Sequence, residues 1–340
     1  MSSKDVSQRP LNLRAGDWVE VRCAREILAT LDTESALDGL PFMPEMLRYC
    51  GKRFRVYKSA HKTCDTIEQY VIRRMSNAVH LEGLRCDGSA HGGCQAGCLL
   101  FWKDAWLKRV PTGPPAPDDS KQNPDEAVCA EEALRSGTRM PSVGGTEAAE
   151  RYRCQATELV RATSEVRRRD RFDPRFYFKD LTSGNVGVGQ FIRYGALAVF
   201  NSLMATFRGY RYPRLCGIAG SQTPSCHLNL QPGELVQVRS KDEIMATLNP
   251  RLRNRGLLFD VEMVPYCENG DYRVLTRVER IINEKTGQMM KLPNPCLILD
   301  GVTCSGNRSA HRMFCPRNVY PYWHEVWLRR PDDESAQESA

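Results

Sequence analysis

The sequence lacks a long apolar run. Its most apolar stretch, residues 190–207, is interrupted by Arg193, Gly195 and Asn201, whereas a membrane-spanning helix needs about 20 consecutive, largely apolar residues. The N-terminal residues MSSKDVSQRPLNLRAGD also lack the central apolar segment of a secretory signal. We therefore expect a cytoplasmic protein that does not insert into a membrane.

A large excess of one charge is missing as well. The chain has 48 basic and 41 acidic side chains, a net charge of +7 at pH 7 over 340 residues, which is too mild for a dedicated polynucleotide binder. It contains no recognised nucleotide, flavin, hydrolase or kinase signature. With 41% hydrophobic and 26% charged residues, the composition is typical of folded domains and excludes a wholly disordered chain, a coiled coil or a collagen-like repeat.

Internal similarity is the strongest feature that is present. Residues 16–50 align without a gap with residues 233–267, and 16 of the 35 aligned positions are identical at a constant offset of 217. Similarity at a fixed spacing indicates a duplicated domain. The match ends with two pairs of tryptophans, which we expect in the cores of the two copies: Trp102 and Trp106 in the first, Trp323 and Trp327 in the second.

Short strand patterns and turns fill each copy. Trp18–Val21 alternates apolar and polar residues as a half-buried strand does, Arg53–Lys58 and Ala105–Val110 indicate further strands, and Arg25–Leu31 has the spacing of a short helix. About 100 residues of this kind are typical of a small, strongly bent barrel. We therefore predict an α+β protein with two SH3-like barrel domains. In chain order, the predicted parts are repeat 1 at 11–110, a linker rich in proline and acidic residues at 111–145, a helical insert at 146–227 and repeat 2 at 228–332.

The predicted insert has two helical patterns. The first begins at Thr146 and carries an apolar stripe as far as Val166. Asp173-Pro174 is a helix-start signal, and a second apolar helix is expected over 190–205.

Fourteen cysteines are the unusual count in the composition. In a reducing compartment, clustered cysteines indicate metal ligands or reactive thiols rather than disulfides. Repeat 1 contains the pattern Cys86-x4-His91-x2-Cys94-x3-Cys98 in a glycine-rich stretch. Thiolate and imidazole are preferred zinc ligands, and four of them complete a closed tetrahedral site. The pattern predicts a zinc site, in which His61 or Cys64 could replace one ligand; an iron–sulfur centre on the three cysteines is the less favoured alternative.

Repeat 2 retains a diverged version of this pattern. Cys304, His311 and Cys315 are present, but Val319 stands where the fourth ligand would align. Either Cys296 completes this second metal site or its fourth position is open. A closed site would be structural, whereas an open position could bind substrate.

Three further residues are candidates for catalysis. Glu45, which is matched by Glu262 in repeat 2, lies among apolar residues that could raise its pKa for general acid or base chemistry. The alternative is that this carboxylate braces a turn in both copies. His61 and Cys64 have no counterpart in repeat 2 and could form a nucleophile pair, although a metal role competes.

The middle of the chain offers two possible binding segments. Gly184, Gly187 and Gly189 precede a predicted helix, whose N-terminus could bind an anion through backbone N–H groups; a simple helix-entry loop is the alternative. Six arginines over 161–175 are followed by three aromatic residues, Phe176, Tyr177 and Phe178. This run could bind single-stranded nucleic acid or an acidic protein partner, or it could be a solvated helix face.

The stretches DGLPFMPEM, RVYKSAHKTCDT and LRCDGSAHGGCQAGCLLFWKDAWL resemble those of an uncharacterised family of bacterial proteins with duplicated, barrel-like Cys/His repeats. Such proteins look similar to ones that are sometimes encoded beside biosynthetic genes, so the resemblance implies an accessory or tailoring enzyme, by association only.

Two functional hypotheses follow. The first is a zinc-binding biosynthetic enzyme or enzyme subunit that acts between the barrels and the insert on a small anionic substrate, or on one tethered to an acidic carrier protein. The second is a metal-stabilised binding module for nucleic acid or an acidic partner.

Overall fold

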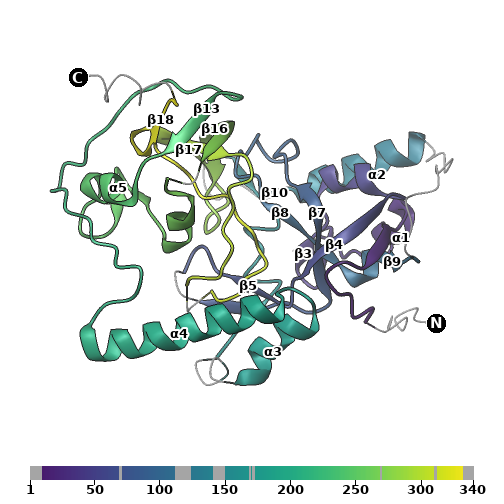
Figure 1. The fold of residues 1–340 in the computed structure, drawn as a ribbon. Coiled ribbons are helices and arrows are strands. Elements are labelled where there is room, and N and C mark those ends of the chain that lie inside the picture. Colours follow the sequence, from purple (N-terminus) through teal and green to yellow (C-terminus); the bar gives the residue numbers. More distant parts are fainter. Residues whose placement is uncertain are drawn as a thin grey trace. The chain divides into compact units, whose positions relative to one another are not determined.

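The computed structural model describes residues 10–68, 71–111, 124–140, 150–167, 170, 173–268, 270–309 and 312–331. The chain divides into two compact units (Figure 1). The first comprises Met1–Phe191 together with two short segments of the later sequence, Ile282–Met289 and Phe314–Arg317. The second comprises Ile192–Ile281, Met290–Met313 and Asn318–Ala340.

The first unit is built on a five-stranded antiparallel sheet. The strands lie in the order β8-β7-β4-β1-β9. Register shifts in the β4–β7 and β7–β8 pairs bend these strands, as bulges do, and the sheet curls. The bounds are β1 Trp18–Val21, β4 Arg53–Ser59, β7 Ala78–Arg85, β8 Leu99–Lys103 and β9 Leu107–Arg109.

The second unit has a four-stranded antiparallel sheet in the order β17-β16-β13-β18. The bounds are β13 Leu235–Val238, β16 Asp271–Ile282, β17 Met289–Leu299 and β18 Leu328–Arg329. The protein is therefore a mixed α+β structure with two curled antiparallel sheets, which is compatible with two barrel-like domains.

The two matched sequence segments contain the same succession of elements. A strand is followed by a short helix, a two-strand hairpin and a 3-10 helix in each. In the first segment these are β1, α1 Ala24–Leu28, β2 Ala36–Leu37, β3 Leu40–Pro41 and η1 Pro44–Tyr49. In the second they are β13, α5 Lys241–Thr247, β14 Arg253–Asn254, β15 Leu257–Leu258 and η4 Val261–Tyr266.

The paired tryptophans lie in the cores, as the sequence predicts. All four side chains are fully buried. The later member of each pair also has a polar partner: the indole N–H of Trp106 donates to Thr30 at 3.1 Å, and that of Trp327 donates to Thr247 at 2.9 Å. A buried aromatic ring with its N–H satisfied is a strong anchor for each core. Short 3-10 turns, η2 Asp104–Trp106 and η5 Glu325–Trp327, precede the last strand of each sheet.

The middle of the chain agrees with the sequence prediction only in part. Two helices are confirmed, α3 Pro174–Thr182 and α4 Val188–Arg208, and Asp173 caps α3 by accepting from the amide of Arg175 at 2.9 Å. The helix predicted from Thr146 to Val166 is wrong over its described residues, 150–166. Residues 150–166 form turns and two-residue strands instead. Their apolar side chains pack against the core of the first unit from an irregular segment rather than from one face of a helix.

The remaining elements are one helix and several short strands. α2 Pro124–Gly137 falls within the predicted linker. The other strands form a two-stranded ladder, β10 Arg139–Met140 with β11 Arg151–Tyr152, and a three-stranded sheet of β12 Ser164–Glu165, β6 Ile72–Arg74 and β5 Lys62–Cys64. Over the described ranges, we find no helix whose length and apolar character would let it cross a membrane.

Candidate metal centre

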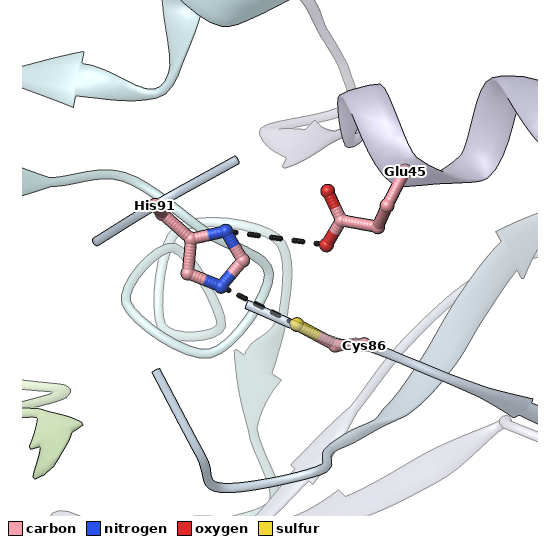
Figure 2. A group of neighbouring side chains, drawn as sticks. All are labelled: Glu45, Cys86 and His91. Carbon is pink, nitrogen blue, oxygen red and sulfur yellow. Dashed lines mark hydrogen bonds and ion pairs between the residues drawn. The ribbon is translucent and has the colours of Figure 1, made fainter. Parts of the chain in front are cut away.

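Glu45, Cys86 and His91 meet in the first unit. The Cys86 sulfur lies 3.3 Å from Nε2 of His91, and Nδ1 of the same ring lies 4.0 Å from Oε1 of Glu45. Figure 2 shows the imidazole between the carboxylate and the thiol. One ligand atom from each of the three residues lies within 4.8 Å of the others. This group could hold a metal ion.

Local structure explains how the three side chains converge. Glu45 stands in the first turn of η1, whose start is fixed by Pro44. Cys86 directly follows β7, and its amide donates to the carbonyl of Cys98 at 2.8 Å, which closes the intervening loop. Within that loop the amide of His91 donates to the carbonyl of Gly88 at 3.1 Å.

Gly88 is the residue on which this loop depends. Its φ is +73°, and a Cβ atom added there would stand 2.1 Å from the carbonyl oxygen of Cys94. Any other side chain would therefore clash with backbone in a left-handed conformation. The glycine lets the chain turn tightly enough to bring His91 back toward Cys86.

The centre is buried, and burial sets its protonation. It raises the pKa of Glu45, an effect that Asp87 reinforces and that the Cys86 thiol and Arg48 oppose. It lowers the pKa of His91 to about 4 and raises that of Cys86 well above its usual range. In the absence of a cation, burial therefore favours the uncharged form of each group.

The polar atoms of this centre are poorly satisfied by the protein. Neither oxygen of Glu45 nor Nδ1 of His91 has a hydrogen-bond partner among the described residues. Glu45 is 7% and His91 1% exposed, so water cannot reach them freely. A buried polar group without a partner is costly, and a bound cation would satisfy all three atoms together.

The matched glutamate of the second unit has a different environment. Glu262 is also buried, but it accepts hydrogen bonds from the amides of Arg308 at 2.6 Å and Ser309 at 2.9 Å. It accepts two more, from the Ser305 hydroxyl at 2.7 Å and the Asn307 amide at 3.2 Å. Here the carboxylate braces a loop, which is the alternative that the sequence left open for both copies.

The two other predicted ligands of the first loop lie close to the same centre. Cys94 and Cys98 line a cavity of about 40 Å³ together with Cys86 and His91. The amide of Ile282 donates to the Cys94 sulfur at 3.4 Å, and burial raises the pKa of Cys98 to about 12. Cys154 lines the cavity as well. No sequence signal points to Cys154, because it is remote from the loop in sequence and belongs to no motif.

The predicted second metal site is divided between the two units. Cys304 belongs to the second unit and Cys315 to the first, while His311 lies outside the described residues. At the spacing of 218 residues that separates Cys86 from Cys304, Ser309 matches His91, and its amide is one of the donors to Glu262. The second site remains a prediction.

His61 and Cys64, the predicted nucleophile pair, contact different residues. His61 lies against Asp180, with 3.3 Å between Nε2 and Oδ1. The amide of Cys64 donates to the Cys315 sulfur at 3.2 Å, and Arg317 donates to the Cys64 carbonyl at 3.1 Å. The Cys64 thiol, helped by Arg317, lowers the pKa of Cys315.

The two predicted binding segments of the insert lie around α3 and the start of α4. Gly184 follows α3 with φ +73°, and Gly187 and Gly189 flank the first residue of α4. In the arginine-rich run, Arg161 pairs with Glu34. Arg168, Arg169 and Arg171 of that run lie outside the described residues. Both segments remain predictions.

Comparison with known proteins identifies no relative: no family model, curated protein or solved structure matches the chain.

Proposed function

We propose that the first unit binds a zinc ion through Glu45, Cys86 and His91. The observation that supports this most directly is that ligand atoms of a carboxylate, a thiol and an imidazole lie within 4.8 Å of one another in a buried place where the carboxylate has no other described partner. In the matched position, Glu262 is bound by four protein donors and needs no cation.

The donor set favours zinc over other ions. Zinc binds thiolate, imidazole and carboxylate, with distances of about 2.3 Å to sulfur and about 2.0 Å to nitrogen or oxygen. Calcium and magnesium prefer oxygen ligands, so a thiol and an imidazole count against them. An iron–sulfur centre needs several thiolates around each cluster, and here only Cys86 belongs to the converging group.

We propose a structural role for this ion. The adjoining cavity of about 40 Å³ can hold an ion with a water molecule but is too small for an organic substrate. The fourth position would go to that water or to one of the neighbouring thiols, such as Cys98. The ion would then tie η1 to the loop between β7 and β8.

For the wider function, we propose a biosynthetic tailoring enzyme that acts on a small anionic or carrier-tethered substrate. We also propose that each curled sheet belongs to an SH3-like barrel and that the two barrels are a duplicated pair. The buried zinc would support this activity without touching substrate. The binding module for nucleic acid or an acidic partner is the alternative, and the exposed Arg175 beside the aromatic residues of α3 is what favours it.

Metal content tests the zinc site. We expect about one zinc per chain in protein purified under reducing conditions with zinc supplied. Cys86→Ser and His91→Ala should each lower zinc occupancy by about tenfold or more, because each removes one of three protein ligands. Cys216→Ser, at an exposed cysteine of the second unit, is the matched control. Full zinc retention by both site variants would show that the ion, if bound, lies elsewhere.

A further inference from the structure

The first unit contains a second, larger cavity that the metal centre does not use. Its volume is about 400 Å³, which falls within the range of small-molecule pockets, about 300–1,000 Å³. The wall combines the segment before β1, the ends of β4 and β7, and the last turn of α3. Leu13, Met75 and Val79 give it an apolar part, and most of its other lining side chains are polar.

Like Asp104 and Ser183, His61 is a buried polar residue of this wall. Its residue is 6% exposed, and neither ring nitrogen has a well-formed hydrogen bond among the described residues. Nε2 lies 3.3 Å from Oδ1 of Asp180. A buried imidazole with an unused nitrogen at the wall of a cavity indicates a missing hydrogen-bond partner.

Asp180 is held in place by a buried cation. Its side chain is fully buried in α3, and Oδ2 accepts from Nζ of Lys62 at 2.6 Å, while Oδ1 is the atom nearest His61. Lys62 is itself fully buried. Lys62 therefore pairs with the Asp180 carboxylate. This carboxylate orients the His61 ring, as a third group orients the base beside an activated nucleophile. Burial lowers the pKa of His61, so the ring keeps an unprotonated nitrogen at neutral pH.

The charges around the cavity favour an anion. Arg14 and Lys179 both line it and are exposed, and neither forms an ion pair with a described residue. Asp104 is the one acidic residue among those that line the cavity. Its Oδ2 already accepts from the amide of Leu11 at 3.0 Å. The two exposed cations, Arg14 and Lys179, outnumber the single carboxylate of Asp104, so the potential at the entrance of the cavity is positive.

We propose that this cavity binds a small hydroxylated organic anion. The carboxylate or phosphate of the ligand pairs with Arg14 and Lys179, and a ligand hydroxyl donates to His61. The side chains of Ser59 and Thr182, which also line the cavity, supply further hydrogen bonds. The inference is independent of zinc, and it deepens the tailoring-enzyme proposal by naming a substrate class.

Titration calorimetry with defined probes tests this site. The probes are inorganic phosphate, citrate and glycerol 3-phosphate, with glycerol as the uncharged analogue of the last. We expect saturable binding of glycerol 3-phosphate and no saturation with glycerol. Lys179→Met should weaken binding by about threefold or more, because it removes a charge at the entrance and keeps the side-chain length. Lys52→Met, at an exposed lysine outside the cavity wall, should change nothing.

His61→Asn tests the buried part of the site. This variant keeps a polar side chain but shortens it, and it should weaken glycerol 3-phosphate binding about tenfold, the usual effect of losing one hydrogen bond to a charged or oriented group. In the wild type, the His61 ring resonances should shift on titration. No saturable binding of any of the three anions, or equal affinities in wild type, Lys179→Met and His61→Asn, would overturn the proposal. Zinc content in the same variants should stay at the wild-type level, which separates this test from that of the metal centre.

Discussion

Replacing Glu45 and Glu262 by glutamine, one at a time, should have opposite consequences at two matched positions. Both residues stand in the first turn of a 3-10 helix and both are buried. Glu262 accepts four hydrogen bonds from residues 305–309, whereas neither oxygen of Glu45 has a described partner. The two substitutions should therefore differ in their effect on stability, although the residue type and the matched position are the same.

The magnitude for Glu262→Gln follows from the donors that lose an acceptor. A glutamine oxygen can serve about two of the four donors, and its amino group faces the others. Each buried donor without an acceptor costs about 1–3 kcal/mol, so the free energy of unfolding of the second unit should fall by about 2–6 kcal/mol.

Among the described residues, the oxygens of Glu45 have no well-formed hydrogen bond that Glu45→Gln could remove. In metal-free protein we therefore expect a change in the free energy of unfolding of less than about 1 kcal/mol. With zinc at about 1,000 times its dissociation constant, the wild type should gain about 4 kcal/mol by mass action. The Glu45→Gln variant should gain less, because it lacks the carboxylate ligand.

Urea unfolding of both variants, with and without zinc, measures these changes. Because the two units need not unfold together, hydrogen exchange at the amides of Arg308 and Ser309 gives a local readout for Glu262→Gln. A loss of metal-free stability in Glu45→Gln as large as that in Glu262→Gln would refute the reasoning, since it would mean that Glu45 also braces its unit.

Two further predictions concern the first unit. Burial lowers the pKa of His80 to about 3, so its contribution to stability is complete above pH 6.5 and is lost as the pH falls toward 3. At about 1.4 kcal/mol per pH unit, urea unfolding should show the advantage of the wild type over His80→Asn shrinking by about 2–3 kcal/mol between pH 7 and pH 4.5; a constant difference would contradict this. Gly88→Ala should abolish zinc retention, because its Cβ would meet the Cys94 carbonyl. Gly83→Ala, with a similar φ of +72° but open space around it, should keep the metal and lose only about 1 kcal/mol; equal zinc contents in the two variants would contradict the role of the loop.

The sequence predicted local structure well where short-range pattern decides it. The strand at Trp18–Val21, the helix after Asp173 and the buried tryptophans are examples. It failed over 150–166, because the apolar residues there have helical spacing but pack from turns. Tertiary packing decides that segment, and no local signal reveals it.

The site was predictable only in part. Cys86 and His91 were predicted as ligands because their spacing is a local signal, and the structure places them 3.3 Å apart. Glu45 was noticed because both copies contain it, but the ligand role that we propose for it depends on a contact between residues about forty positions apart. Asp180, the partner of His61, could not be found at all, because nothing in the sequence links α3 to the segment between β4 and β5.

X-ray absorption at the zinc edge of the zinc-loaded wild-type protein tests the central proposal most directly. We predict one or two sulfur ligands at about 2.3 Å and two or more nitrogen or oxygen ligands at about 2.0 Å, with the Cys86 sulfur lost in Cys86→Ser. A shell of three or more sulfur atoms would contradict the proposal, because the ion would then lie among Cys86, Cys94 and Cys98 and not beside Glu45.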